Sequence, residues 1–213
     1  MPKYNLIYVD EEPSKRNDFL RDTEDDFKVV AMAPVIDIDE LIETLLHSQA
    51  DAFVIDYKLG ETDRTISYNG VEVVKKIHTK RPKFPCFIFT NYDNDAISES
   101  EDVNYVYSKD VMTGSIGKIS FNDRIKAQIK NYQDNLTNLE QELIELIAKG
   151  KNHPLNSAEE QNLIKLDTLL NHYLNKNIDV PAELKESKQL KKLEELISIS
   201  EKLLSKLNSS GKK

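Results

Sequence analysis

Short apolar runs alternate with amphipathic segments through the first half of the chain, and this alternation limits the folds that the sequence can adopt. The runs lie in the stretches YNLIYVD, FKVVAMAPV, ADAFVID, FPCFIFTN and NYVYSKD. Their length and their content of β-branched and aromatic residues are typical of buried strands. Strands that alternate with helices pair in parallel and carry helices on both faces of the sheet. We therefore expect a doubly wound α/β domain with a five-stranded parallel sheet.

The segments between these runs carry the signals of helix starts. PSKRNDFLRDT has a proline in its first turn. In DIDELIETLLHSQ, Asp37 is a candidate N-cap with Glu40 three residues later, and the apolar residues share one face. NGVEVVKKIHTK is a further expected helix, and DNDAISESED a weak one.

The pattern changes at Ser120, where helical periodicity replaces the strands. Up to Gly150 the apolar residues repeat at alternating spacings of four and three, which is a heptad seam. Its members are Ile125, Ile129, Tyr132, Leu136, Leu139, Leu143 and Leu146. A second helix is predicted to begin at a capping box, Ser157 with Glu160, and a third follows Pro181.

Two arrangements can bury the heptad seam. The helix can pair with a second copy of the chain as a coiled coil, or it can form the buried face of a bundle with the two following helices. The heptad pattern alone does not decide between them, but the short connections at residues 150–156 and 176–181 favour packing within the chain, with a homodimer as the alternative. In both, one continuous helix would leave the α/β domain. We expect residues 1–119 to form that domain and residues 120–213 an all-α helical or coiled-coil region for output or interaction.

Composition and charge narrow the function classes. No apolar run approaches the roughly 18 residues of a membrane span, and the N-terminus lacks the pattern of a signal peptide, so we expect a cytoplasmic protein. Residues 1–118 hold 14 basic against 23 acidic residues, and residues 119–213 hold 15 against 14. Neither half is the strongly basic surface that nonspecific nucleic-acid binding requires, so we do not expect a nucleic-acid partner. The single cysteine, Cys86, lies in an apolar run and is expected to be a core thiol.

Carboxylates stand at the ends of two expected strands. Asp56 closes the third apolar run, and Asp10 and Glu11 follow the first. With strand order 2-1-3-4-5 these two strands are neighbours, and ligands collect at their carboxyl ends. Carboxylates that lie this close together raise each other's pKa unless a cation compensates their charge. A cluster of oxygen ligands alone suits Mg²⁺.

Two further residues end strands at the same edge. Lys109 follows the fifth apolar run and Thr90 ends the fourth. A lysine beside the acids can neutralise charge, and a threonine hydroxyl can donate one hydrogen bond. Both are what a phosphoryl group held on a carboxylate would need.

The motifs VDEEP, VIDYKLG, FIFTN and YVYSKD, in this order, resemble those of the receiver domain of two-component response regulators. The resemblance covers about residues 3–120 and implies a flavodoxin-like fold. It implies that Asp56 accepts a phosphoryl group from a phosphohistidine, so that a histidine kinase or a histidine phosphotransfer protein would be the partner. Lys109 would pair with the phosphoryl oxygens, and Thr90 would donate a hydrogen bond to one of them.

The resemblance also implies a magnesium site. Asp10 and Glu11 would position the ion directly or through water. Asp56 and the backbone carbonyl of Lys58 would be further ligands.

The sequence departs from the receiver pattern at several positions. Gly60 follows the acceptor closely but Gly70 lies fourteen residues beyond it, so Glu61 to Asn69 form a lengthened loop over the site. Asn91 stands where a small residue normally follows the threonine. Asp110 replaces the usual proline after the lysine. The switch aromatic is expected at Val106, although tyrosines flank that position.

Three functions compete. The first is a response regulator whose output is protein interaction through the helical region, with an unidentified output partner and a homodimer as an option. The second is a degenerate receiver that serves as a scaffold or a phosphate-sink decoy. The third, a phosphohydrolase, ranks last because Lys58 occupies the place of its general acid. We thus expect no enzyme activity beyond the protein's own phosphorylation and dephosphorylation.

Overall fold

A parallel sheet forms the centre of the α/β part of the chain. The computed structural model describes residues 3–91, 98, 106–112 and 115–173. The strands are β1 (Tyr4–Val9), β2 (Phe27–Met32), β3 (Ala52–Asp56), β4 (Cys86–Thr90) and β5 (Val106–Ser108). All neighbours pair in parallel and the order is β2-β1-β3-β4-β5. The predicted flavodoxin-like order 2-1-3-4-5 is confirmed.

Helices connect the strands and continue beyond them. They are α1 (Pro13–Thr23), α2 (Ile38–His47), α3 (Gly70–Lys80), α5 (Ser115–Asn152) and α6 (Ser157–Tyr173), with a short 3-10 turn η2 (Lys109–Met112) after β5. The weak helix expected in DNDAISESED and the helix expected after Pro181 lie outside the described residues, apart from Ser98. No helix in the described part of the chain is both long and apolar enough to cross a membrane.

Side-chain caps explain where three helices begin. Asp37 is the N-cap of α2, as predicted, and its carboxylate accepts from the amide of Asp39 at 2.8 Å. Asn69 and Glu72 form a capping box at α3. The capping box predicted at Ser157 and Glu160 is wrong by one residue. It is made by Asn156, whose side chain accepts from the amide of Glu159 at 3.0 Å, while its own amide donates to the Glu159 carboxylate at 3.1 Å. The asparagine oxygen reaches the orphan amides of the first turn as well as a serine would.

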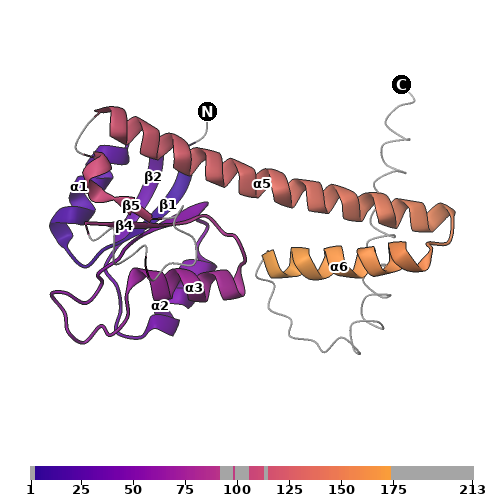
Figure 1. Ribbon diagram of the computed structural model, residues 1–213, viewed down its shortest axis with the longest axis horizontal. Helices are drawn as coiled ribbons and strands as arrows, with labels where there is room; N and C mark the ends of the chain where they lie inside the picture. Colours follow the sequence, from indigo (N-terminus) through magenta and orange to yellow (C-terminus); the bar gives the residue numbers. More distant parts are fainter. Residues whose placement is uncertain (1–2, 92–97, 99–105, 113–114, 174–213) are drawn as a thin grey trace, which may run out of the picture. The chain divides into compact units, whose positions relative to one another are not determined.

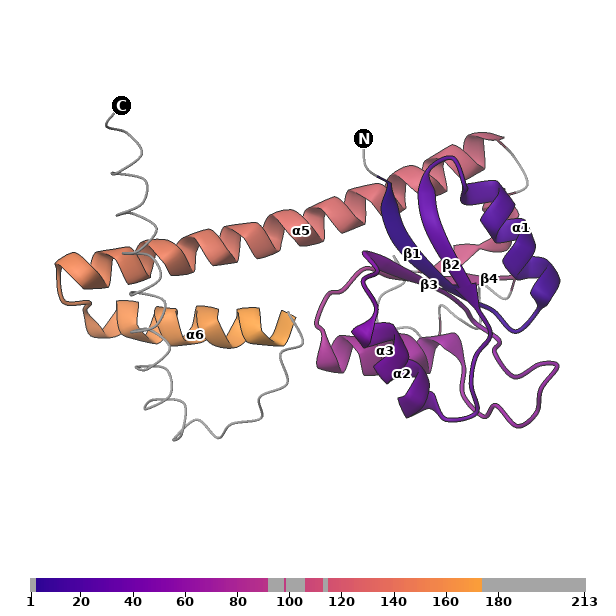
Figure 2. The same cartoon turned by 180° about the vertical axis from the view of Figure 1, so that it is seen from behind.

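Helices cover both faces of the sheet (Figures 1 and 2), and a hydrophobic core lies on each face. On one face α1 and the first turns of α5 contribute Phe19, Phe121, Ile125 and Ile129. On the other face α2 and α3 contribute Leu41, Ile42, Leu45, Val73, Val74 and Ile77. Because helices cover both faces, every residue of β3 is buried. Each fully buried aliphatic or aromatic side chain stabilises the fold by about 1.5–3 kcal/mol.

The residues of the heptad seam of α5 pack in two different environments. Ile125 and Ile129 pack onto the sheet, whereas Tyr132 joins the core on the α2 and α3 side. Leu136 and Leu139 are partly buried against that same core. The helix runs from Ser115 to Asn152, beyond both ends of the predicted span. The predicted boundary between residues 119 and 120 therefore falls within α5, and the division into domains stays a prediction.

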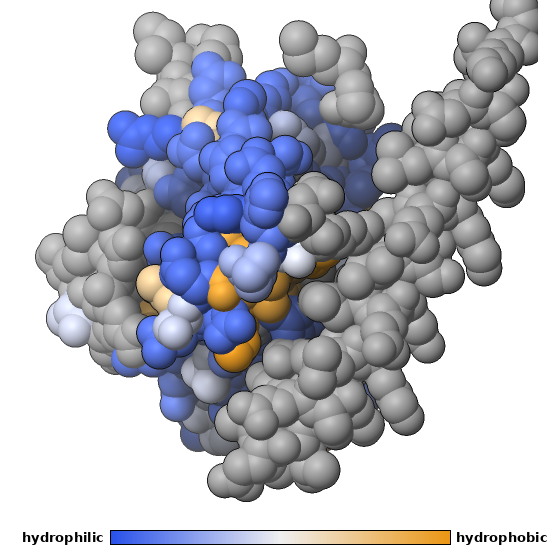
Figure 3. Space-filling view, turned by 90° about the vertical axis from the view of Figure 1, so that its right-hand side faces the viewer, coloured by the Kyte–Doolittle hydropathy of each residue, from blue (hydrophilic) through white to orange (hydrophobic). Residues whose placement is uncertain are grey.

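A helical hairpin follows, in which α6 runs back alongside α5 (Figure 1). Asn162 of α6 donates to Glu142 of α5 at 2.9 Å, and Lys149 pairs with Glu159. Seen from the side of the turn, hydrophobic residues form a small group within a mainly hydrophilic surface (Figure 3). The bundle of α5 and α6 agrees with the intramolecular alternative, while the third helix and self-association remain predictions.

One arginine joins the hairpin to the α/β part. Arg81, directly after α3, donates from Nε to the Tyr132 hydroxyl at 3.2 Å and to the Tyr173 carbonyl at 3.0 Å. Its guanidinium lies 4.0 Å from the centre of the Phe84 ring. The last described residue of α6 is therefore held against the turn that leads into β4.

Candidate functional site

Polar side chains converge at the carboxyl edge of the sheet. Asp10 follows β1, Asp56 ends β3, Thr90 ends β4 and Lys109 follows β5. Asp10, Asp56 and Thr90 are 1%, 7% and 1% exposed, which is rare for such polar groups unless they have partners. The parallel order brings four residues that are far apart in the sequence to one edge of the sheet.

Lys109 connects the two buried carboxylates. Its Nζ lies 2.7 Å from Asp56 Oδ1 and donates to Asp10 Oδ2 at 2.9 Å. Burial alone would lower the pKa of Lys109, but the carboxylates of Asp56 and Asp10 together raise it above its usual value. The lysine therefore stays charged and compensates the two acids.

Asp56 is the perturbed acid of the site. Burial raises the pKa of its carboxyl from 3.8 to about 6, although the Lys109 charge acts in the opposite direction. At neutral pH the group is largely ionised, while its solvation is incomplete. A carboxylate that is charged, buried and paired with one lysine is a suitable nucleophile for an electrophilic phosphorus.

Asp10 is held by donors that the sequence analysis did not identify. The Tyr8 hydroxyl donates to Asp10 Oδ2 at 2.5 Å, and the Glu12 amide donates to Oδ1 at 2.8 Å. Burial, and then the Asp10 charge, raise the pKa of Tyr8, so its hydroxyl stays a donor. Tyr8 is two residues before Asp10, and the two-residue period of a strand was the signal that could have placed it on the same side.

Glu11 is turned toward the long loop. Its carboxylate accepts from the amides of Glu61 and Thr62 at 3.1 and 3.0 Å and from the Thr62 hydroxyl at 2.9 Å. The backbone carbonyls of Asp10 and Glu11 accept from Arg16 Nη1 at 2.6 and 2.9 Å, which fixes the turn after β1. Asp10 and Glu11 thus follow the same strand but point to different partners.

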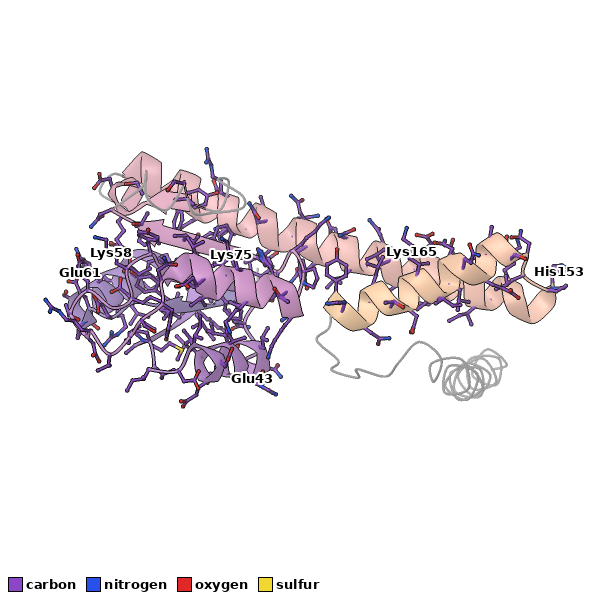
Figure 4. The ribbon with its side chains drawn as sticks, turned by 60° about the horizontal axis from the view of Figure 1, so that its bottom comes forward. Glu43, Lys58, Glu61, Lys75, His153 and Lys165 are labelled. Carbon is purple, nitrogen blue, oxygen red and sulfur yellow. The ribbon has the colours of Figure 1, made fainter. Side chains whose placement is uncertain are left out.

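A cavity of about 240 Å³ opens beside these groups. It is lined by Glu11, Glu12, Lys15, Asp56, Lys58, Glu61, Asn91 and Lys109. Glu12 and Lys15 were not among the expected site residues. The Lys58 ammonium lies 3.4 Å from Glu61, and both residues stand at the same end of the α/β part (Figure 4).

The oxygen atoms at this edge are of the kind that a hard divalent cation binds. Asp10, Asp56 and the backbone carbonyl of Lys58 supply the ligand type that Mg²⁺ prefers, and water completes such sites. Both Glu11 oxygens accept hydrogen bonds from the loop, and hydrogen-bonded carboxylates can still ligate a metal ion. Within the described residues, no group of three or more His, Cys, Asp or Glu side chains is arranged to hold a metal ion. The magnesium role of Asp10, Glu11, Asp56 and Lys58 stays a prediction.

Glycines allow the chain to close around the acceptor. A Cβ added at Gly70 would lie 2.3 Å from the Asp56 carbonyl oxygen, and one at Gly60 would lie 2.2 Å from that of Ile66. Ile66 and Tyr68 are buried, and the Tyr68 hydroxyl donates to a backbone carbonyl before α2. The lengthened loop is therefore packed onto the domain and not merely inserted.

The structure shows the surroundings of three positions that depart from the receiver pattern. Asn91 lines the same cavity as Asp56. Val106 packs against the α2 and α3 core, whereas Tyr107 lies on the opposite face with its ring 5.3 Å from that of Phe121. The Asp110 amide donates to the Ser108 hydroxyl at 3.3 Å, which supports the turn after β5 without a proline. Tyr105 lies outside the described residues.

Comparisons with known proteins give likeness in structure alone. No family model and no curated protein sequence matches the chain. The Francisella response regulator 1452 receiver domain is 15% identical, covering 61% of this chain and 98% of its own, with a TM-score of 0.45. A LuxR-family response regulator from Aurantimonas is 19% identical, covering 61% and 87%, with a TM-score of 0.47. The anti-anti-sigma factor PhyR from Bartonella quintana is 12% identical, covering 65% of this chain and only 51% of its own, with a TM-score of 0.47.

Because these likenesses are weak, the fold is assigned from the strand order of the chain itself. A sheet of order β2-β1-β3-β4-β5 has acids after β1 and β3 and a lysine after β5. The α/β part of the chain has the receiver fold. In this fold, Asp10, Asp56, Thr90 and Lys109 stand at one edge of the sheet, and Glu11 lines the cavity with its oxygens bonded to the loop.

Proposed function

We propose that this protein is a response regulator in which Asp56 accepts a phosphoryl group from a histidine kinase or a histidine phosphotransfer protein. The observation that carries the proposal is the position of Lys109 Nζ, 2.7 Å from Asp56 and 2.9 Å from Asp10. Such a lysine can pair with the carboxylate before transfer and with the oxygens of the incoming phosphoryl group during it. We further propose a cytoplasmic location and no enzyme activity on other substrates.

The transfer is a single displacement at phosphorus. An Asp56 carboxylate oxygen attacks the phosphorus of a phosphohistidine, the P–N bond breaks, and its electron pair stays on the imidazole nitrogen, which takes up a proton. Lys109 neutralises the oxygens that gain charge during transfer. Thr90, buried at the end of β4, supplies a hydroxyl donor beside them.

A divalent cation fits the same edge. Asp10, Asp56 and the Lys58 carbonyl would hold it, and the cation would supply the charge that lets two anions approach each other. Lys109 now lies between Asp10 and Asp56, so it would share this electrostatic role with the cation.

We propose output through the helical region because α5 extends from the sheet into the hairpin. This helix packs onto the sheet through Ile125 and Ile129 and continues into the hairpin with α6. A change at β5 and η2 would reach α5 directly, because η2 leads into it and contacts it. The proposed partner is another protein, with a second copy of the chain as the alternative.

Phosphorylation with a small donor tests the proposal. The protein is incubated with acetyl phosphate and Mg²⁺, and intact mass is measured for the wild type and for Asp56→Asn. We expect a phosphoryl adduct on the wild type that hydroxylamine removes and that the variant lacks. The same adduct on the variant would exclude Asp56 as the acceptor.

A degenerate receiver is the second candidate. The observation that favours it is Glu11, whose oxygens are occupied by the loop. This candidate predicts no adduct on the wild type and no spectral change with beryllium fluoride, even at saturating Mg²⁺.

A further inference from the structure

One buried oxygen of the site, Asp10 Oδ2, accepts from two donors of different kinds. The Tyr8 hydroxyl lies 2.5 Å from it, on the same strand, and Lys109 Nζ lies 2.9 Å from it, after β5. Asp10 is 1% exposed, so water is largely excluded from its carboxylate. A buried acceptor that loses its donors costs free energy, so what happens to this oxygen when one donor moves matters to the site.

Packing holds the Tyr8 donor in place. The residue is 1% exposed, and its ring stacks on Phe19 with the ring centres 4.1 Å apart. Phe89 meets the same ring edge-on, with the centres 6.3 Å apart. A ring packed in this way cannot turn its hydroxyl away from Asp10 without disturbing the core. The phenol is also uncharged, so it orients the carboxylate without neutralising it.

Lys109 is the donor that can move. Its ammonium stands at the end of a flexible four-carbon stem, and it also lies 2.7 Å from Asp56 Oδ1. Its side chain is 13% exposed and lines the acceptor cavity. It also lines a second cavity of about 250 Å³, together with Tyr8, Phe19 and Phe89. The lysine therefore has space around it that the tyrosine ring does not have.

We propose that Tyr8 is a positioning residue for phosphoryl transfer, whose hydroxyl keeps the buried Asp10 oxygen bonded when Lys109 leaves it for the phosphoryl group. The role in transfer rests on the proposed function. The exchange of donors at Asp10 Oδ2 does not, because both donors are present before any transfer. Each part has its own experiment.

A double-mutant cycle tests the shared oxygen. Lys109→Met is made in Tyr8→Phe and in the matched control Tyr4→Phe, which removes the same atom from a tyrosine earlier in β1 that packs against the same core. Equilibrium constants of unfolding are measured in denaturant at neutral pH without metal. We expect Lys109→Met to destabilise the Tyr8→Phe protein about fivefold or more beyond its effect in Tyr4→Phe, because Asp10 Oδ2 then loses both donors. Equal effects in the two backgrounds would overturn the shared role.

The cycle remains decisive where a variant is too unstable to measure. If Lys109→Met folds in Tyr4→Phe but not in Tyr8→Phe, the loss exceeds additivity and supports the proposal. If Lys109→Met folds in neither background, amide exchange of Glu12, which donates to Asp10 Oδ1 at 2.8 Å, is compared in Tyr8→Phe and Tyr4→Phe. Faster exchange in Tyr8→Phe alone would support the positioning of Asp10 by Tyr8, and equal exchange would overturn it.

The kinetics of phosphorylation test the role in transfer. Adduct formation is followed by intact mass over a range of acetyl phosphate concentrations with Mg²⁺, for the wild type, Tyr8→Phe and Tyr4→Phe. We expect Tyr8→Phe to lower the maximal rate about fivefold or more, and to leave the half-saturating donor concentration within about twofold, because Tyr8 acts through Asp10 and not on the donor. Tyr4→Phe should change neither quantity by more than about twofold.

Two results would count against this role, and they have different meanings. An unchanged maximal rate in Tyr8→Phe would overturn the positioning role while the proposed function stands. A wild type that forms no adduct would overturn the proposed function and the transfer role with it. The unfolding cycle would then still decide whether Tyr8 and Lys109 replace each other at Asp10.

Discussion

At the scale of single residues, the environment of Asp56 gives a definite prediction of how stability depends on pH. Its pKa is raised by burial from 3.8 to about 6, so its ionisation is less favourable in the folded state. A raised pKa contributes stability that is fully present below about pH 4 and is lost as pH rises through about 6. Replacing Asp56 by Asn should therefore raise the free energy of unfolding at pH 7.5 by about 1–3 kcal/mol and have little effect near pH 4. Denaturant unfolding in metal-free buffer at several pH values measures this.

The matched control for that measurement is Asp123→Asn, which removes the same charge from an exposed position on α5. Its effect should be within about 0.5 kcal/mol at every pH. If Asp56→Asn instead lowers stability at neutral pH, the Lys109 pair outweighs the cost of burial.

Among the elements, α3 and α6 are joined by a side chain that makes several contacts at once. Arg81 donates to Tyr132 and to the Tyr173 carbonyl, and its guanidinium stacks on Phe84. Removing it leaves the hydroxyl of the buried Tyr132 with one contact fewer and takes away the cation–π contact. We expect Arg81→Ala to cost about 1–3 kcal/mol and to raise amide exchange in the last turn of α6. Arg64→Ala, in the exposed loop, is the control. Unchanged exchange near Tyr173 would show that α6 is held by its apolar side chains alone.

For the molecule as a whole, α5 belongs to two packing regions, and this predicts how they separate. Ile125 and Ile129 belong to the sheet, whereas Leu136 and Leu139 pack where α5 meets the core that includes Tyr173 of α6. Replacing both leucines by Asp should release the hairpin with a loss of several kcal/mol, because charges would then lie against apolar groups. The helical circular dichroism signal should fall by the contribution of α6 and the end of α5. Protection of the β1 and β3 amides from hydrogen exchange should persist.

Ile144→Asp provides the control for the hairpin experiment, since Ile144 lies on the same helix but is 58% exposed. It should change stability by less than about 0.5 kcal/mol. If protection in β1 and β3 disappears together with the hairpin in the double variant, the two regions unfold as one cooperative unit.

The sequence by itself determined the strands, their parallel order and the four residues that meet at their carboxyl ends. Asp10, Asp56, Thr90 and Lys109 each follow or end an apolar run. In a parallel sheet the strand direction alone then places them on one edge. Helix starts such as Asp37 were also readable, because a cap involves only neighbouring residues.

Only the tertiary structure decided the partners of individual side chains. Glu11 and Asp10 are adjacent, yet Glu11 turns to donors fifty residues away, which no local pattern encodes. Likewise, the seam of α5 has one regular period, but Ile125 packs on strands and Leu136 near α6. Periodicity identifies the residues that share a face of a helix. Which surface covers that face depends on long-range packing, where apolar side chains lose the same water-accessible area against a sheet or another helix.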